Sequence, residues 1–283
     1  MKIIAAIPEM KAVARDWASR GVVIGFVPTM GFLHAGHLSL VRAAKKNADV
    51  TVVSLFVNPA QFGPMEDFKA YPRDLERDAA MLEGEGVDVL FHPGAEEMYP
   101  PGFATFVEVS GLQDKLCGRS RPGHFRGVCT VVLKLFEIVR PDVAFFGQKD
   151  AQQAIILRAM ARGLNLGARI EVLPIVREAD GLALSSRNSY LSADEKKAAL
   201  VLSRSLVAAR KLIDGGERNA ENVLAAVRRM ILEEPTARID YIEAVSQETL
   251  DPVGEIAEGA LIALAVFIGK TRLIDNLIVR LEE

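Results

Sequence analysis

The sequence has few of the features that mark secreted, membrane-spanning or nucleic-acid-binding proteins. Only two cysteines, Cys117 and Cys129, occur among 283 residues, and their spacing matches neither a disulfide framework nor a common zinc motif. The longest strongly apolar run, 260–268, is much shorter than the about 20 residues that a bilayer-spanning helix needs. Lys and Arg total 34 against 37 Asp and Glu, without a basic tract, so nucleic acid is not an expected partner.

The N-terminal residues lack the apolar core and the cleavage site of a secretory signal. We therefore expect a cytoplasmic location, reduced cysteines and no membrane partner. Hydrophobic residues make up 50% of the chain and charged residues 25%, which is enough to fill an aliphatic core and leave a charged surface. Because the length exceeds that of an average domain, two domains are expected.

Two familiar phosphate-binding motifs are nearly present but incomplete. Gly269-Lys270-Thr271 looks like the end of a P-loop, but Leu264 stands where the first glycine belongs, within a strand-like run. Gly84-Glu85-Gly86 begins like a dinucleotide fingerprint, but Val89 replaces the third glycine and the segment ends a helix. Walker-type hydrolysis and a Rossmann dehydrogenase are therefore both disfavoured.

Strand and helix patterns alternate through the first part of the chain. A β-branched run at 21–27 predicts a strand, apolar spacing at 38–46 predicts a helix, and 50–57 is typical of a fully buried strand. This order predicts a doubly wound parallel α/β sheet, with ligands beyond the carboxyl ends of its strands. The further elements predicted are helices at 73–83, 128–139 and 151–162 and strands at 87–91, 143–146 and 169–174.

The pattern changes towards the C-terminus. Ser192-Ala193-Asp194-Glu195 fits a capping box, and apolar residues at helical spacing follow it until Gly215-Gly216. We therefore predict a boundary at residue 176, with a Rossmann-like domain at 1–176 and a smaller α+β domain at 177–283. The further elements predicted there are a helix at 220–233 and strands at 238–245, 261–268 and 273–281.

Two histidines, His34 and His37, stand at a glycine-containing helix entrance after the first predicted strand. At this spacing both imidazoles can point the same way, and the N-terminus of a helix favours anions. Gly31 and Gly36 permit a close approach of the backbone. The pattern favours a polyphosphate site, and two alternatives stay open: the histidines only cap the helix, or they bind a metal.

Polar residues also follow other predicted strands. Asn58 and Gln61 come after a buried strand, where neutral amides can bond a carboxylate or a hydroxyl, although turn formation is an alternative for them. Lys149 and Asp150 follow another buried strand, where they can bind a phosphate and ribose hydroxyls. For this second pair the alternative is a surface ion pair.

Three further groups complete the set of candidates. Ser185-Ser186-Arg187 is a compact set of donors suited to phosphate oxygens, and a polar linker is its alternative. Gln153, one turn into a predicted helix, can face the same cleft. The basic residues Arg121, His124 and Arg126 are interpreted as a solvated loop outside the site.

Taken together, the motifs resemble those of the pantothenate synthetase family, also called pantoate–β-alanine ligases. This family lies within the nucleotidyltransferase superfamily, whose His-x-Gly-His signature binds ATP phosphates. Ala35 and Leu184 are departures, since many members carry Glu and Met there. The matching stretches run in order over nearly the whole chain: 28–37, 56–62, 71–74, 117–118, 121–128, 146–153 and 184–188.

The resemblance implies an ATP-dependent ligase that activates pantoate as an acyl-adenylate and then joins it to β-alanine, which gives pantothenate, AMP and pyrophosphate. It implies that His34, His37 and Lys149 are catalytic, with His37 as the candidate proton donor. It also implies Mg²⁺ with ATP, a homodimer, and a C-terminal domain that closes over the cleft. The metal ligands stay unassigned.

The resemblance also assigns residues to the substrates. Gln61 and Gln153 are expected to hold pantoate, with Gln61 also near β-alanine. Asn58 is added to this group because of its position beyond the same buried strand. The residues expected to bind ATP are Met30, Gly31, His34, Gly36, His37, Gly147, Gln148, Lys149, Asp150, Val176, Leu184, Ser185, Ser186 and Arg187.

Overall fold

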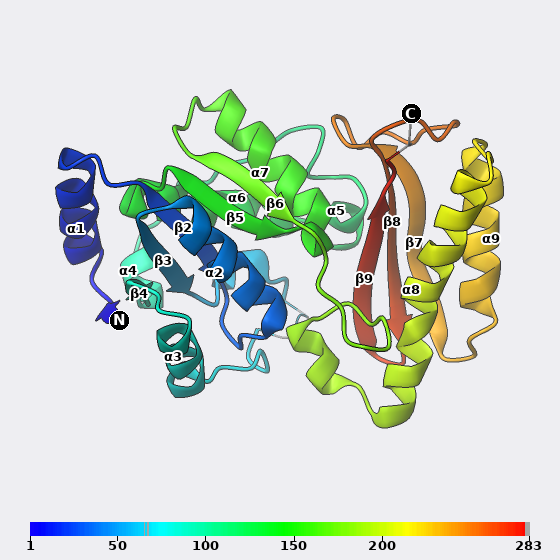
Figure 1. The fold of residues 1–283 in the computed structure, drawn as a ribbon, viewed down its shortest axis with the longest axis horizontal. Coiled ribbons are helices and arrows are strands. Elements are labelled where there is room, and N and C mark those ends of the chain that lie inside the picture. Colours follow the sequence, from blue (N-terminus) through cyan, green and yellow to red (C-terminus); the bar gives the residue numbers. More distant parts are fainter. Residues whose placement is uncertain (65, 67, 281–283) are drawn as a thin grey trace. The chain divides into compact units, whose positions relative to one another are not determined.

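The computed structural model describes residues 1–64, 66 and 68–280, and the chain divides into two compact units (Figure 1). The first unit comprises Met1–Gln113, Arg121–Gly147 and Ile156–Pro174; the second comprises Asp114–Ser120, Gln148–Ile155 and Ile175–Glu283. Two short segments that precede the predicted boundary at residue 176 thus belong with the C-terminal residues. Within the described residues, no helix has the length and apolar character to cross a membrane.

The first unit is built on a six-stranded parallel sheet. The chain moves outward from β2 to β3 and β4 on one side and to β5 and β6 on the other, which is the order of a doubly wound fold. The predicted α/β class is therefore confirmed. The strands, in order across the sheet, are β1 (Lys2–Ile4), β4 (Val89–Phe91), β3 (Val50–Leu55), β2 (Ile24–Thr29), β5 (Val143–Gly147) and β6 (Arg169–Leu173).

Helices cover both faces of this sheet. Val27 of β2 clusters with Val41 of α2 (Ala35–Asn47), whereas the ring of Phe26 meets Phe136 of α6 (His124–Val139) at 6.4 Å between centroids. Because neighbouring side chains of a strand point to opposite faces, α2 and α6 lie on opposite sides of β2 (Figure 1). The other helices with residues in this unit are α1 (Ile7–Ser19), η1 (Pro59–Gln61), α3 (Leu75–Gly84), α4 (Ala95–Met98) and α7 (Ala151–Gly163), whose start belongs to the second unit.

The strand before the histidines begins and ends later than predicted. β2 covers Ile24–Thr29 and includes Pro28, which lies opposite Ser54 of β3. Proline has no N–H to donate to a neighbouring strand. On the β5 side, however, β2 is paired only at Gly25 and Phe26, so no hydrogen bond from Pro28 to β5 is needed. The patterns also fail to predict β1, an edge strand of 3 residues that is too short for a period-two signal, and α1.

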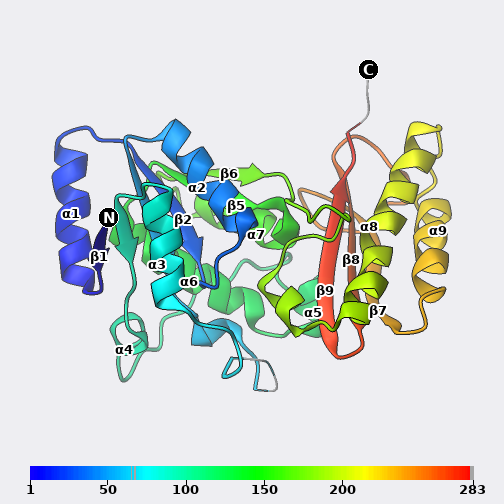
Figure 2. The same ribbon diagram turned by 60° about the horizontal axis from the view of Figure 1, so that its bottom comes forward.

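The second unit contains a three-stranded antiparallel sheet, ordered β7-β8-β9. Two long helices lie on one face of this sheet, and Leu206 and Val227 on those helices share its core with Leu264 (Figures 1 and 2). The predicted sequence of helices followed by strands is confirmed, and residue 281, the predicted end of the last strand, lies outside the described residues. The elements are α5 (Cys117–Ser120), η2 (Gln148–Asp150), η3 (Ser186–Tyr190), α8 (Ala193–Asp214), α9 (Ala220–Leu232), β7 (Ala237–Ser246), β8 (Ala260–Ile268) and β9 (Thr271–Ile278).

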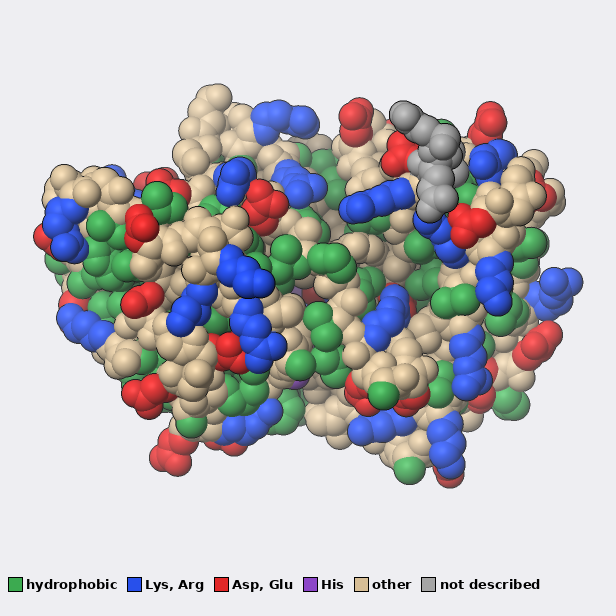
Figure 3. Space-filling view, in the orientation of Figure 1, with side chains coloured by type: hydrophobic (Ala, Val, Ile, Leu, Met, Phe, Trp, Pro, Cys, Tyr) green, Lys and Arg blue, Asp and Glu red, His purple; other side chains and the backbone are tan. Residues whose placement is uncertain are grey.

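The two incomplete phosphate motifs have ordinary structural positions. Gly269-Lys270-Thr271 forms the turn from β8 into β9, and Gly84-Glu85-Gly86 forms the end of α3, with Gly84 as its last residue and Glu85 as its C-cap. Neither segment leads from a strand into the start of a helix, as a phosphate loop does. On the face drawn in Figure 3, Lys and Arg side chains are interspersed with Asp and Glu, an arrangement that gives this face no extended basic surface.

Candidate active site

The predicted phosphate motif lies where β2 ends and α2 begins. His34 is the N-cap of α2, and its Nδ1 accepts a hydrogen bond from the N–H of Gly36 at 3.2 Å. The Nδ1 of His37 accepts from the N–H of His34 at 3.3 Å, so the two histidines form a capping box. Their ring centroids are 4.1 Å apart. A neutral imidazole whose Nδ1 accepts carries its proton on Nε2, so each ring caps the helix with one nitrogen and has a donor on the other.

Capping and phosphate binding are therefore compatible roles for these histidines. The structure shows the capping, which was one of the alternatives, and phosphate binding stays a prediction. Within residues 1–64, 66 and 68–280, no group of three or more His, Cys, Asp or Glu side chains could hold a metal ion, and metal binding by the histidine pair stays an alternative.

A buried carboxylate from α3 holds the loop in front of these histidines. Asp78 is 1% exposed, and its oxygens accept from the N–H of Phe32 at 2.6 Å and of Leu33 at 2.8 Å. Burial raises the pKa of the Asp78 carboxyl, while the two backbone donors act in the opposite direction. Gly31 has φ +84, and a Cβ there would stand 3.1 Å from Asp78 Oδ2. A glycine is needed because the turn is left-handed and crowded.

The two amides after β3 form a single buried unit. Asn58 is 1% exposed; its Nδ2 donates to Gln61 Oε1 at 3.0 Å and to the carbonyl of Gly127 at 3.1 Å. The Asn58 Oδ1 accepts from the Tyr99 hydroxyl at 2.7 Å. Gln61 Nε2 in turn lies 3.0 Å from the sulfur of Met30. These contacts orient Gln61 towards the residues that precede the histidine loop.

The structure corrects the interpretation of Arg121, His124 and Arg126 as a solvated loop, because His124 and Arg126 lie in the first turn of α6. The Arg121 side chain is 15% exposed and forms a two-pronged ion pair with Glu66, at 2.7 and 2.6 Å. His124 is 9% exposed, and its Nδ1 bonds the carbonyl of Gln61 at 2.8 Å. Buried polar side chains need partners from elsewhere in the chain, which a local pattern does not reveal. Of the three, only Arg126, with 44% of its side chain exposed, fits the solvated interpretation.

A close backbone approach joins α6 to this region. A Cβ at Gly127 would lie 2.1 Å from the carbonyl oxygen of Ala60, so only glycine lets α6 pack against η1. The same approach brings the Gly127 carbonyl within reach of Asn58. Gln61 is therefore held in place by contacts among η1, α6 and Tyr99.

The other candidates lie in the second unit, except Gly147, which ends the Arg121–Gly147 segment of the first unit. Gln148, Lys149 and Asp150 form η2, directly after the end of β5. Lys149 and Asp150 are thus neighbours within one short turn, and their binding of phosphate and ribose stays a prediction. In the helix that follows, Gln152 is buried and bonds the main chain at residues 115 and 117, whereas the predicted Gln153 is half-buried.

The segment from Val176 to Arg187 is a defined loop rather than a loose linker. The N–H of Leu184 donates to the carbonyl of Val176 at 3.0 Å, and Arg177 bridges to Ala183. Ser185 is the N-cap of η3, and its hydroxyl accepts from the N–H of Arg187 at 3.3 Å. Ser186 and Arg187 follow within the same short helix.

The structure thus groups the predicted residues unit by unit. The first unit contains Met30, Gly31, His34, Gly36, His37, Asn58, Gln61 and Gly147. The second unit contains Gln148, Lys149, Asp150, Gln153, Val176, Leu184, Ser185, Ser186 and Arg187. Their roles towards substrates stay predictions.

Sequence reasoning missed several residues that hold these groups in place. Asp78 gives no signal, because other charged residues surround it in α3. Asp275 and Asn276 do give one: they are two polar residues inside the otherwise apolar core of the last strand, Leu273 to Ile278. Such an interruption indicates a buried polar contact.

Comparison with known proteins identifies the family. The chain matches the family described as pantoate-beta-alanine ligase over residues 2–278. It is 58% identical to pantothenate synthetase of Heliobacterium modesticaldum over 279 residues, which cover 99% of each chain, and 57% identical to that of Thermosipho africanus, covering 99% of this chain and 100% of the relative.

Solved structures agree with this relationship. Pantothenate synthetase of Thermus thermophilus superposes with a TM-score of 0.94 at 46% identity, covering 99% of this chain and 100% of that one. The Francisella tularensis ligase, solved with β-γ ATP and β-alanine, gives a TM-score of 0.81 at 35% identity over 98% and 97% of the two chains. The chain therefore belongs to the pantoate-beta-alanine ligase family.

Proposed function

We propose that this ligase joins pantoate to β-alanine through a pantoyl-adenylate, with release of pyrophosphate and then of AMP. Condensation of the two substrates with use of ATP is the activity of its family. The observation that carries the adenylate route is the histidine capping box of α2. It places two imidazole rings, each capping through Nδ1, at the positive end of a helix, where a polyphosphate is favoured.

The first step is attack of the pantoate carboxylate on the α-phosphorus of ATP. A carboxylate has a pKa of about 4 and is already ionised at neutral pH, so this step needs no general base. It needs alignment and stabilisation of charge on the phosphates. His34, His37, Lys149 and Arg187 are the proposed donors, of which Lys149 acts as a point charge and Arg187 as a planar fork.

Gln61 is proposed to hold pantoate through its side-chain amide. Gln61 Oε1 accepts a hydrogen bond from Asn58 Nδ2, and this contact fixes the orientation of the amide, with Nε2 beside the sulfur of Met30. We infer that Asn58, with both polar atoms bonded inside the protein, contributes to pantoate binding by orienting Gln61. Gln153 is the second proposed pantoate residue.

In the second step the β-alanine amine attacks the acyl carbonyl, and AMP leaves. The amine must lose a proton, and the departing phosphate gains negative charge. His37, with a donor at Nε2, is proposed to give or relay the proton and to stabilise that charge. Gln61 is also proposed to lie near β-alanine.

Mg²⁺ is proposed to bind with ATP, where it offsets the phosphate charge. This ion usually takes its ligands from phosphates, water and one or two carboxylates. A homodimer, a cytoplasmic location and closure of the C-terminal domain are further proposals.

Isotope exchange tests this route. Enzyme, Mg²⁺, ATP and pantoate should exchange labelled pyrophosphate into ATP in the absence of β-alanine, and omission of pantoate should abolish the exchange. His37→Ala should lower the exchange rate roughly 10²-fold, the scale for loss of one preorganised donor. Release of ADP, or no pantoate-dependent exchange by enzyme that still makes pantothenate, would overturn the adenylate intermediate.

A further inference from the structure

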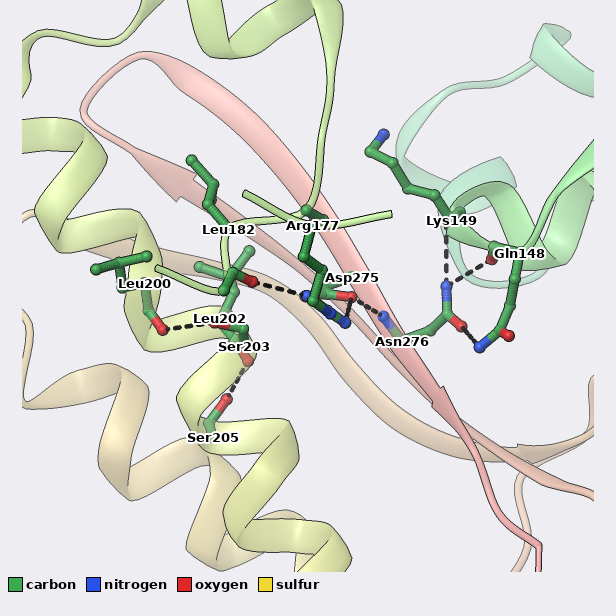
Figure 4. Close-up of polar contacts among 12 residues, drawn as sticks. Gln148, Lys149, Arg177, Leu182, Leu200, Leu202, Ser203, Ser205, Asp275 and Asn276 are labelled. Carbon is green, nitrogen blue, oxygen red and sulfur yellow. Dashed lines mark hydrogen bonds and ion pairs between the residues drawn. The ribbon is translucent and has the colours of Figure 1, made fainter. Parts of the chain in front are cut away.

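Two consecutive buried polar residues, Asp275 and Asn276, interrupt β9. They are 3% and 5% exposed, respectively. Neighbouring side chains on a strand point to opposite faces, and in Figure 4 the two side chains reach different loops. Asn276 contacts η2, whereas Asp275 contacts the loop that begins at residue 176.

Asn276 holds the turn that carries Lys149. Its Nδ2 donates to the carbonyl oxygens of Gln148 at 2.9 Å and of Lys149 at 3.1 Å, and its Oδ1 accepts from Gln148 Nε2 at 3.1 Å. Three of the four hydrogen bonds that a primary amide can make are therefore used on one turn. The Lys149 side chain extends away from Asn276 (Figure 4), so the contact fixes the backbone and leaves the ammonium group for another partner.

Asp275 holds the second loop through a two-pronged ion pair. Its Oδ2 accepts from Arg177 Nη1 at 2.7 Å, and its Oδ1 accepts from Nη2 at 2.9 Å (Figure 4). The same Nη1 donates to the carbonyl of Gly181 at 3.1 Å, across the loop. Arg177 also bridges to Ala183, next to the predicted ATP residue Leu184. A paired fork of this kind fixes direction as well as distance.

We propose that Asp275 and Asn276 are positioning residues that set the two ATP loops, residues 148–150 and 176–187, against a single strand. This inference rests on the proposed function, which assigns both loops to ATP. Lys149 and Asn276 are separated by 127 residues, and Arg177 and Asp275 by 98. β9 is hydrogen-bonded to β8 along its length, so it offers both loops one rigid support. The two loops are then already ordered before ATP binds, so binding costs little additional conformational entropy.

The test separates this role from a merely structural one. Asn276→Asp keeps the side-chain size but replaces both donors to the carbonyls with an acceptor. We expect the Kd for a non-hydrolysable ATP analogue, measured by calorimetry, to rise roughly 10-fold, as for loss of one or two hydrogen bonds, while the KM for β-alanine stays unchanged. Arg177→Lys keeps the charge but loses the fork, and should weaken analogue binding in the same direction.

Asn219→Ala is the matched control. Asn219 is the N-cap of α9 in the same unit, and its loss should lower the melting temperature without changing the Kd for the analogue. Wild-type Kd in a folded Asn276→Asp variant would overturn the positioning role, and if that variant does not fold, wild-type Kd in Arg177→Lys would do so. Lys149→Ala and Arg187→Ala serve as a separate check: if both bind the analogue like wild type, the ATP assignment of the loops is at fault.

Discussion

Among the described helices, α2 and α8 begin with a capping box, and the two boxes differ in chemistry. At α8 the hydroxyl of Ser192 accepts from the N–H of Glu195 at 3.2 Å, and the Glu195 carboxylate accepts from the N–H of Ser192 at 2.8 Å. At α2 the same positions are taken by His34 and His37. Both boxes satisfy N–H groups that the first helical turn leaves unpaired.

The difference lies in what each box leaves at the helix start. A glutamate complements the positive end of the helix dipole with its own charge, and would repel a phosphate there. A neutral imidazole caps with one nitrogen and carries a donor on the other, so it adds no negative charge that would repel an anion at the positive end of the helix. Because a Ser–Glu pair is enough to cap α8, we expect the histidine pair of α2 to have a second task, which is the proposed binding of phosphate.

The largest expected effect comes from exchanging one box for the other. In a variant with His34→Ser and His37→Glu, the cap of α2 is retained, so the free energy of unfolding should change by about 1 kcal/mol or less. Pantoate-dependent pyrophosphate exchange should fall roughly 10³-fold, because both donors are lost and a negative charge faces the phosphates. Chemical unfolding and the exchange assay measure the two effects. Exchange at the wild-type rate would show that the histidines are only caps.

The second largest effect is expected at Asp78, which holds the loop in front of the α2 capping box. Asp78→Ala leaves the N–H groups of Phe32 and Leu33 without their carboxylate, which should lower the free energy of unfolding by about 2–3 kcal/mol. Asp74→Ala is the matched control on the same helix, because it removes only the N-cap of α3 and should cost about 1 kcal/mol. Equal losses in urea unfolding would mean that the loop does not depend on Asp78.

The pH dependence of this second effect has a defined sign. Burial raises the pKa of Asp78 above its ordinary value of 3.8, so the folded protein holds this proton more tightly than the unfolded chain. The proton-linked part of its stabilisation is fully present below the unfolded pKa and is lost as pH rises through the folded pKa. The difference in free energy of unfolding between wild type and Asp78→Ala should therefore become smaller as the pH rises from about 3 through the raised pKa of Asp78 in the folded protein. A difference that widens with pH would contradict the raised pKa.

The smallest effect is expected at the ordinary box. Ser192→Ala removes one capping hydrogen bond and should lower the free energy of unfolding by about 1 kcal/mol. Since no substrate role is assigned to this helix start, exchange and pantothenate formation at 25 °C should be unchanged. A marked loss of ATP binding in folded Ser192→Ala would show that the two boxes are less different than their chemistry indicates.

By itself, the sequence determined the features that follow from local patterns. The alternation of buried strands with helices predicted the doubly wound sheet, because side-chain periodicity and burial are set within each segment. The Ser-x-x-Glu box of α8 and the histidine entrance of α2 were also predicted, since a cap involves residues only three apart.

Only the tertiary structure decided which polar side chains are buried and which partners satisfy them. The sequence pattern predicted a solvated Arg121, but in the folded chain Arg121 pairs with Glu66, which is 55 residues away in the sequence. Asp78 likewise accepts a hydrogen bond from Phe32, 46 residues earlier, in the loop before His34. Asn276 bonds a turn 127 residues earlier in the chain. Burying such groups is favourable only when partners are present, and those partners become neighbours through folding, so no window of local sequence contains them.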